Sequence, residues 1–381
     1  MNGTVILYLM IFLVTTLLAL LSQVLGKNKK IKVRRSFLYA SFIIHWIFLA
    51  FTNIGADYNN YVRIIKNISL ENLLGDSEVV FSGFCLVLKS LVESPDIVIF
   101  FIKTITLVLF YIAFMEIAQE ANIGLCMFAF NAFVYLQGYF ILGMQIAIAC
   151  LLLSTIYLKQ DKKKKALLFL LLACGLHSSA ILFIPLFVMY FILDIRKKKM
   201  SIRFVSLMVI AYIVVYFCVG YIMTWGIDHI PQLAQYRIYN MMSDYRGTGL
   251  VQILFFIPLL YFLYLINRNS NSINLKNLSI VFILTAFLFS MIGYKIEVFS
   301  RINKSFLMIY AYLIPSFFFE RKNNNYQSIR GVTTSFLFNY RSDLIFWVIY
   351  ICIRGIDMFI DMGLKSSTSL LNPFVWFNPF G

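Results

Sequence analysis

Long runs of apolar residues recur along the whole chain, separated by short polar or charged segments. Many of these runs hold about 20 residues, and an α-helix of that length crosses the hydrocarbon core of a bilayer. Apolar and polar residues do not alternate within the runs, so the pattern predicts helices rather than the strands of a β-barrel. The candidate spans are 4–25, 36–54, 97–117, 122–140, 141–158, 202–224, 251–266, 279–294, 303–319 and 342–360.

Two further segments fit a simple span less well. Residues 78–92 are apolar but short and include Lys89, which favours a helix that lies in the membrane interface or dips in and returns. Residues 166–193 are too long for one span and too short for two. Their stretch "ACGLHSSA" (173–180) places glycine and serines beside His177, which predicts a broken or re-entrant segment.

These patterns predict an all-α, polytopic membrane helix bundle with about 10–12 transmembrane or re-entrant helices. We expect residues 1–381 to form a single integral membrane domain. Composition agrees, because 61% of the residues are hydrophobic and only 13% are charged. Soluble domains carry about 25% charged residues. The net charge of +16 is concentrated in short loops, a placement that indicates membrane topology rather than nucleic-acid binding.

The basic segments also predict the orientation of the chain, because lysine and arginine are enriched in cytoplasmic loops. Segments 27–35, 159–165, 194–203 and 320–330 carry most of this charge and are expected to be cytoplasmic. The loops 55–96, 225–250 and 295–302 then face the outside. Both ends of segment 166–193 face the cytoplasm, so that segment must enter the membrane and turn back.

Polar residues of mixed chemistry gather in the predicted external segments. Carboxylates there could act as general acid or base, arginines could bind phosphate, and tyrosines could hold sugar rings. The candidate catalytic residues are Asp57, Glu78, His177 and Arg301. The candidate substrate-binding residues are Tyr58, Tyr61, Arg63, Gln145, Tyr236, Arg237, Tyr239 and Arg246.

Purely structural roles are alternatives for several of these residues. Tyr58 and Tyr61 could anchor the protein at the membrane interface, and Asp57 could cap a helix that starts near Tyr58. Arg301 could form an ion pair with a glutamate one helical turn earlier, and His177 could bond the exposed backbone of the helix break. Arg237 and Arg246 could be ordinary solvated residues of a loop rather than ligand-binding residues.

The sequence gives no motif for a bound metal or nucleotide. It contains no nucleophile elbow, no HExxH and no phosphate-binding glycine loop, and its six cysteines show no CxxC spacing. We therefore expect no metal and no cofactor, and we expect the cysteines to be small buried apolar residues. A substrate that carries its own activation, such as a sugar on a phosphate leaving group, fits this set of residues better than ATP.

The order of motifs among the apolar runs resembles the Wzy-type polysaccharide polymerases, specifically their EpsG-like branch. The likeness runs from about residue 53 to 315 and is carried by "GADYNNY", "EVVFSGFCLVLKSL", the stretch from "GMQIAIAC" to "LHSSAILFIPL", "YRIY" and "FSRINKSFLMIYAYLIP". One departure is clear. The family usually has arginine-glutamine where this chain has Met144 and Gln145. If that arginine binds pyrophosphate in relatives, then Arg237, Arg246 or Arg301 must supply the charge here.

The resemblance implies an architecture similar to the C-type glycosyltransferases and a polymerase of surface polysaccharide, such as O-antigen, capsule or exopolysaccharide. The implied substrate is an oligosaccharide repeat unit on undecaprenyl pyrophosphate, joined to another unit on the outer face of the bacterial cytoplasmic membrane. Membrane lipid, a chain-length regulator and a flippase are further expected partners. By the same resemblance, the acid-aromatic motif maps onto Asp57, Tyr58 and Tyr61, and the helix-break histidine onto His177. The late arginine maps onto Arg301.

On this interpretation, arginines hold the donor pyrophosphate, and Arg301 is the leading candidate for that role. Asp57 or Glu78 takes the proton of the acceptor hydroxyl. Two other classes of function remain open. A flippase for lipid-linked oligosaccharide would share a broken helix and buried polar residues. An acyltransferase that modifies surface sugars would need a histidine and an acid near its acyl donor.

Overall fold

The computed structural model describes residues 3–26, 31–55, 57–73, 78–192, 198–229, 251–327 and 334–359. Within these ranges the chain is helical and contains no β-strand. Contacts group the chain into two compact units. The first unit comprises residues 1–181 and 310–381, and the second comprises residues 182–309.

The first unit is built around a fully buried helix, α8 (Leu142–Lys159), in which every residue from Leu142 to Leu158 is buried. A helix that is apolar on all sides is stable only inside a bundle, where neighbouring helices cover each face. Helix α8 packs against α6 and α9, while α1 packs against α2 and α7. The surrounding helices are α1 (Gly3–Leu25), α2 (Ile31–Ala50), α6 (Pro95–Glu116), α7 (Ile123–Phe133), α9 (Lys163–Leu176), α16 (Ile314–Gln327) and α17 (Thr334–Phe359).

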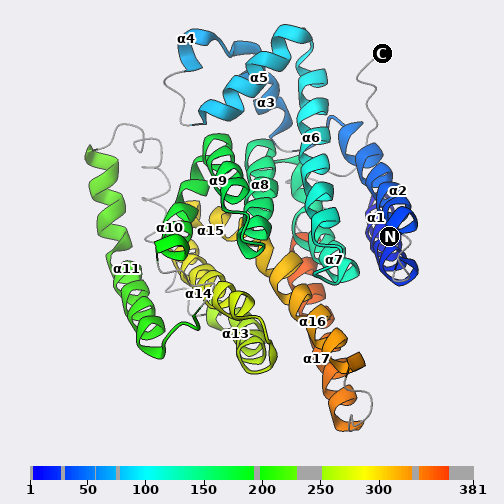
Figure 1. Ribbon diagram of the computed structural model, residues 1–381. Helices are drawn as coiled ribbons and strands as arrows, with labels where there is room; N and C mark the ends of the chain where they lie inside the picture. Colours follow the sequence, from blue (N-terminus) through cyan, green and yellow to red (C-terminus); the bar gives the residue numbers. More distant parts are fainter. Residues whose placement is uncertain are drawn as a thin grey trace. The chain divides into compact units, whose positions relative to one another are not determined.

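Three short helices of the first unit lie together near one end of α9 (Figure 1). They are α3 (Tyr58–Asn67), α4 (Leu70–Leu73) and α5 (Val79–Leu91). Helix α5 packs on α9 and α6, and α3 packs on α6 and α5. Helix α3 is amphipathic: Tyr58, Tyr61 and Ile65 share its inner face at helical spacing, and Ile65 is fully buried. This arrangement places the acid-aromatic motif against the bundle.

The second unit is centred on α14 (Ile273–Lys295), which packs against α11, α13 and α15. Polar contacts fix the start of α14. Ser272 caps its first turn, and Tyr190 donates a 2.6 Å hydrogen bond to Asn274 Oδ1. The other elements are α10 (Ile184–Ile192), α11 (Ile202–His229), α13 (Val251–Asn269) and α15 (Glu297–Lys304). The segments η2 (Ser178–Phe183) and η5 (Ile309–Leu313) straddle the boundaries of the two units.

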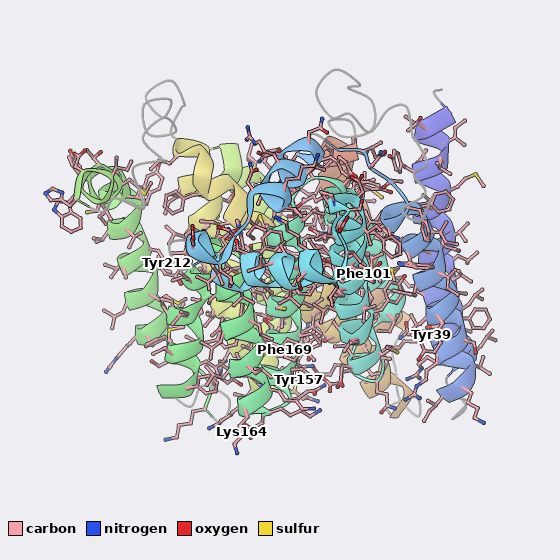
Figure 2. All side chains as sticks on the ribbon, turned by 90° about the horizontal axis from the view of Figure 1, so that it is seen from above. Tyr39, Phe101, Tyr157, Lys164, Phe169 and Tyr212 are labelled. Carbon is pink, nitrogen blue, oxygen red and sulfur yellow. The ribbon has the colours of Figure 1, made fainter. Side chains whose placement is uncertain are left out.

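Six helical stretches among the described residues are long and apolar enough to cross a membrane. Two of them expose most of their apolar side chains, namely 4–25 in α1 and 202–229 in α11. Figure 2 shows side chains projecting from the outer surfaces of the bundle helices. Such faces would be unfavourable in water and suit contact with lipid. The protein is therefore a multi-pass membrane protein. The six stretches are 4–25, 95–116, 142–159, 202–229, 273–293 and 302–322.

The predicted break in segment 166–193 is confirmed, because α9 ends at Leu176 and the chain continues as the 3₁₀ segment η2 and then α10. Two expectations were wrong. The predicted span 122–140 is a shorter α-helix, α7, followed by the 3₁₀ helix η1 (Tyr135–Tyr139). Not all cysteines are buried: Cys218 and Cys352 are exposed, because they lie on outward faces of apolar helices.

Candidate functional site

A carboxylate and an imidazole meet where α5 begins and α9 ends. Glu78 immediately precedes α5, and His177 is the residue at which α9 terminates in extended backbone. Nδ1 of His177 pairs with Oε1 of Glu78, and the Ser178 backbone N–H lies 3.5 Å from the same oxygen. Both side chains remain about one quarter exposed. The pair is therefore held by the fold yet open to a ligand.

The first turn of α8 faces this pair. A Cβ atom built on Gly143 would lie 3.5 Å from Oε2 of Glu78 and 3.5 Å from the carbonyl oxygen of Leu176. The first backbone N–H groups of a helix have no partner within the helix, and they carry the positive end of its dipole. The carboxylate of Glu78 thus lies beside a surface that favours negative charge.

Tyr61 connects α3 to the first turn of α8. Its hydroxyl takes part in backbone hydrogen bonds with Gly143 and Leu142, and its ring packs edge-on against Phe81 at 6.2 Å between centroids. Burial raises the pKa of the Tyr61 hydroxyl, and the charges of Asp57 and Glu78 raise it further. The backbone hydrogen bonds lower the pKa. Tyr61 is therefore a neutral hydroxyl on which the charges of both acids act.

The pair Glu78–His177, with Tyr61, Gly143 and Ser178 around it, is referred to below as the Glu78–His177 site. Asp57 lies close enough to influence Tyr61 by its charge. Although Asp57 precedes α3, its side chain makes no capping hydrogen bond, so the predicted capping role is not observed. The alternative in which His177 bonds the exposed backbone of the helix break is not observed either, because its partner is a side chain.

Tyr58 points to a different partner, one that sequence reasoning missed. Its hydroxyl donates to Oδ1 of Asp96, which lies in the first turn of α6. Burial is the main cause that raises the pKa of Tyr58, followed by the hydrogen bond and the charge of Asp96. The carboxylate of Asp96 is stabilised by its position in the first turn of α6, since helix N-termini stabilise negative charge.

A buried lysine lies beneath this contact. Lys103 is 1% exposed, and its Nζ lies 5.8 Å from the ring centroid of Tyr58 and 5.7 Å from that of Tyr139. Nζ also donates a 2.6 Å hydrogen bond to the carbonyl oxygen of Thr52. A charged residue within an apolar run is a recognisable sequence signal, because an unpaired charge is unfavourable at that depth. In this chain the signal is the lysine of "FFIKTITLV".

The glycine of the "GAD" motif has a backbone role. Gly55 has a φ of +127°, which residues with a Cβ rarely adopt. A Cβ there would lie 2.0 Å from the carbonyl oxygen of Tyr139. The chain can therefore turn from α2 into α3, and so position Asp57 and Tyr58, only with glycine at this position.

The other predicted residues are distributed differently. Arg63 lies on the exposed face of α3 and donates a 2.8 Å hydrogen bond to Asn60. Gln145 is buried in α8 and donates a 2.8 Å hydrogen bond to the carbonyl oxygen of Val134, which links α8 to the preceding turn. Arg301 lies on α15 of the second unit, and its side chain is outside the described part of the chain. The residues Tyr236, Arg237, Tyr239 and Arg246 are also outside the described residues.

Comparison with known proteins gives a family but no individual relative. No curated protein and no solved structure matches the chain. The family model described as the EpsG family matches residues 35–360, which includes every predicted site residue and both members of the Glu78–His177 pair. The EpsG family comprises polymerase-like membrane proteins of polysaccharide biosynthesis that resemble glycosyltransferases. Because the match covers most of the sequence, the chain belongs to the EpsG family.

Proposed function

We propose that the protein is a polysaccharide polymerase that joins oligosaccharide repeat units carried on undecaprenyl pyrophosphate. The reaction takes place on the outer face of the bacterial cytoplasmic membrane, needs no metal or nucleotide, and contributes to O-antigen, capsule or exopolysaccharide. The observation that carries the proposal is the Glu78–His177 pair at the first turn of α8. Membership of the EpsG family supports the same class of reaction.

The chemistry requires a proton acceptor for the attacking sugar. The hydroxyl oxygen of the acceptor unit bonds to the anomeric carbon of the donor, and the bond from that carbon to the pyrophosphate oxygen breaks. Both electrons of the broken bond leave with the lipid pyrophosphate, so no external energy source is needed. The proton of the acceptor hydroxyl must go to a base, which raises the rate by about 10²–10⁴.

His177 is suited to that role when Glu78 orients it. A carboxylate that accepts the Nδ1–H of a histidine fixes its tautomer and leaves Nε2 available as a base. Glu78 then stabilises the imidazolium that forms. This assignment refines the interpretation from sequence, in which Asp57 or Glu78 took the proton directly. Tyr61 offers a neutral hydroxyl to a sugar.

The pyrophosphate requires positive charge, which arginine supplies best because its guanidinium binds two phosphate oxygens at once. We propose Arg301, on α15, for this role, with Arg237 and Arg246 as further candidates. Tyr58, Tyr236 and Tyr239 are proposed to hold the sugars. The chain-length regulator and the flippase remain proposed partners.

The test uses purified protein and lipid-linked repeat units, with products separated as a ladder of lengths. Glu78→Gln should reduce the rate of polymer formation by roughly 10²-fold or more, because His177 loses the carboxylate that orients it. The matched control is Glu71→Gln. Glu71 is an exposed acid on α4, so this variant makes the same substitution outside the site. A full ladder from the Glu78→Gln protein would contradict the proposal.

A deletion strain distinguishes the proposal from the other two classes of function. Loss of a polymerase leaves surface glycan of single repeat units, whereas loss of a flippase abolishes its export and loss of an acyltransferase removes only an acyl group. Mass spectrometry of the surface glycan measures which of these occurs. Normal chain length would contradict the proposed polymerase.

A further inference from the structure

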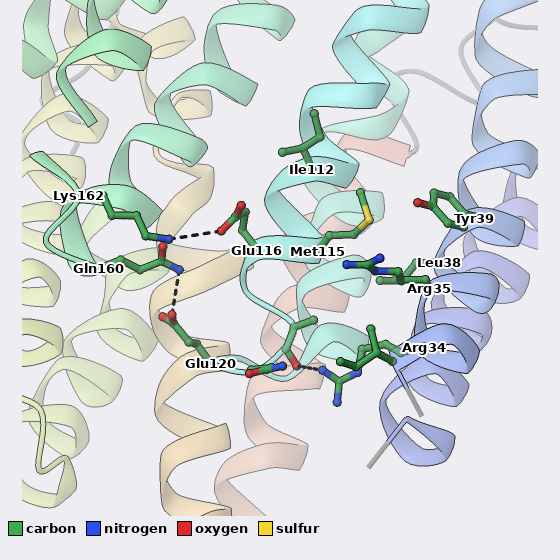
Figure 3. A pocket seen from close by; sticks show the side chains of 13 residues that line it. Arg34, Arg35, Leu38, Tyr39, Ile112, Met115, Glu116, Glu120, Gln160 and Lys162 are labelled. Carbon is green, nitrogen blue, oxygen red and sulfur yellow. Dashed lines mark hydrogen bonds and ion pairs between the residues drawn. The ribbon is translucent and has the colours of Figure 1, made fainter. Parts of the chain in front are cut away.

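The first unit contains a polar cavity at the opposite end of α8 from the Glu78–His177 site. Its volume is about 930 Å³, and α2, α6 and the turn from α8 into α9 line it (Figure 3). The Glu78–His177 site lies at Gly143 in the first turn of α8, whereas Gln160 of this cavity follows the last residue of the same helix. We refer to it as the arginine cavity.

Helix α2 contributes the positive charge. Ile31, Arg34, Arg35 and Leu38 follow one another at helical spacing and all line the cavity. Arg34 is held in place by backbone carbonyls: Nη1 donates to Ala118 at 3.2 Å and Nη2 to Gly26 at 3.3 Å. Neither of these partners carries a charge, so the guanidinium is fixed without being neutralised.

The acids of the cavity have other cations as partners. Glu116 pairs with Lys162 at 3.8 Å, and Glu120 pairs with Lys159 at 3.3 Å. Glu120 also accepts hydrogen bonds from Gln160 and Tyr312. In Figure 3 the dashed lines join Glu116 and Glu120 to the α8–α9 turn and not to α2.

Two guanidinium groups therefore remain without an acid partner among the described residues. Arg35 is exposed and makes no hydrogen bond or ion pair within the described part of the chain. In Figure 3 it extends beside Met115 of α6. Arg35 and the anchored Arg34 together form a surface with two positive charges. Guanidinium groups bind phosphate oxygens bidentately.

The outer rim of the cavity is apolar and uncovered. Ile31 and Tyr39 line it and are each 51% exposed. A soluble anion would leave these side chains without a partner. A lipid would cover them with its acyl chains while its phosphate contacts the arginines, since the cavity lies where the candidate spans 95–116 and 142–159 end.

We propose that the arginine cavity binds the headgroup of an anionic glycerophospholipid. The site is separate from the proposed polymerase chemistry, and it recognises the lipid by its phosphate and net negative charge. Arg35 is the residue that gives the cavity its unpaired charge, and Arg34 gives it a fixed position. The apolar rim selects a lipid over a free phosphate ester.

The test is native mass spectrometry of the full-length protein, purified in detergent and incubated with phosphatidylglycerol, phosphatidylcholine or inorganic phosphate. The protein should retain phosphatidylglycerol in preference to phosphatidylcholine. Arg35→Gln should weaken retention by on the order of tenfold, as expected for loss of one charge-assisted contact. Arg35→Lys should retain most of the binding, which also shows that substitution at this exposed position leaves the protein folded.

Lys32→Gln is the matched control, because Lys32 is an exposed cation on the same turn of α2 that does not line the cavity. Its phosphatidylglycerol retention should equal that of the unchanged protein. The proposal is overturned by unchanged retention in Arg35→Gln, by an equal loss in Lys32→Gln, or by retention of phosphatidylcholine at the same level. Displacement of the lipid by millimolar inorganic phosphate would also overturn it, by assigning the cavity to a soluble anion.

Discussion

A single hydroxyl group connects the short helix α3 to the long helix α6. The Tyr58 hydroxyl donates to Asp96, while the ring of Tyr58 lies over Lys103. A carboxylate, a phenol and a buried lysine thus form one chain of contacts from the acid-aromatic motif into the bundle. Neither Asp96 nor Lys103 was among the predicted site residues, yet they explain why a tyrosine follows Asp57.

Replacing Tyr58 with phenylalanine removes only the hydroxyl and keeps the ring over Lys103. We expect the free energy of unfolding to fall by roughly 1 kcal/mol, because the bond to a charged acceptor is lost at a half-buried position. Thermal unfolding in detergent should show this as a lower midpoint. Tyr221→Phe is the control, since Tyr221 is 82% exposed on α11. Equal midpoints for the two variants would contradict the role given to this hydroxyl.

At the scale of elements, the decisive contact is the close approach of α5 to α9. A Cβ on Gly175 would lie 2.2 Å from Cγ2 of Val80 and 2.9 Å from its Cβ. Contacts that short force the backbone to move, because the Cβ of valine cannot rotate away. Val80 is two residues from Glu78, and Gly175 is two residues from His177. The absence of a side chain at Gly175 therefore sets the spacing of the Glu78–His177 pair.

Gly175→Ala should consequently separate α5 from α9 and reduce polymer formation by roughly tenfold to a hundredfold, since small displacements of catalytic groups are strongly felt. The protein should still insert and purify, because alanine favours helix over glycine. Gly83→Ala makes the same substitution in α5, where the nearest atom would be 3.9 Å away, and should leave the rate unchanged. Full activity of Gly175→Ala in the product-ladder assay would show that this spacing is not required.

The elements of this site differ in how far the sequence alone predicts them. The break at His177 was predictable, because glycine and serines interrupt an apolar run and cannot continue a buried helix without partners. The pairing of His177 with Glu78 was not, because the two residues are 99 positions apart and meet only when α5 packs on α9. Local sequence patterns indicate where helices begin and end. The contacts between helices depend instead on side-chain packing over the whole unit.

At the scale of the whole molecule, the first unit has two chemically different ends. The Glu78–His177 site lies at the start of α8 and the arginine cavity at its end, and a helix of 18 residues spans about 27 Å. Among the described residues of the first unit, Lys159 and the run 162–165 form a lysine cluster at the second end, whereas the first end carries only the separate lysines Lys66 and Lys89 on α3 and α5. Figure 2 shows Lys164 at the edge of the molecule, near Tyr157 and Phe169 of the same end. That asymmetry is the physical basis of the proposed orientation, because cytoplasmic loops are enriched in lysine and arginine.

Cysteine labelling of intact spheroplasts measures this orientation directly. Glu71→Cys places a thiol on exposed α4 near the Glu78–His177 site, and Lys164→Cys places one on the exposed start of α9. A maleimide that cannot cross the membrane should label the first variant in intact cells and the second only after permeabilisation. The unchanged protein is the control, because the native Cys218 and Cys352 are exposed and set the background. If Lys164→Cys is labelled in intact cells and Glu71→Cys is protected, the site faces the cytoplasm. Lipid-linked repeat units displayed on the outer face could then not reach the Glu78–His177 pair.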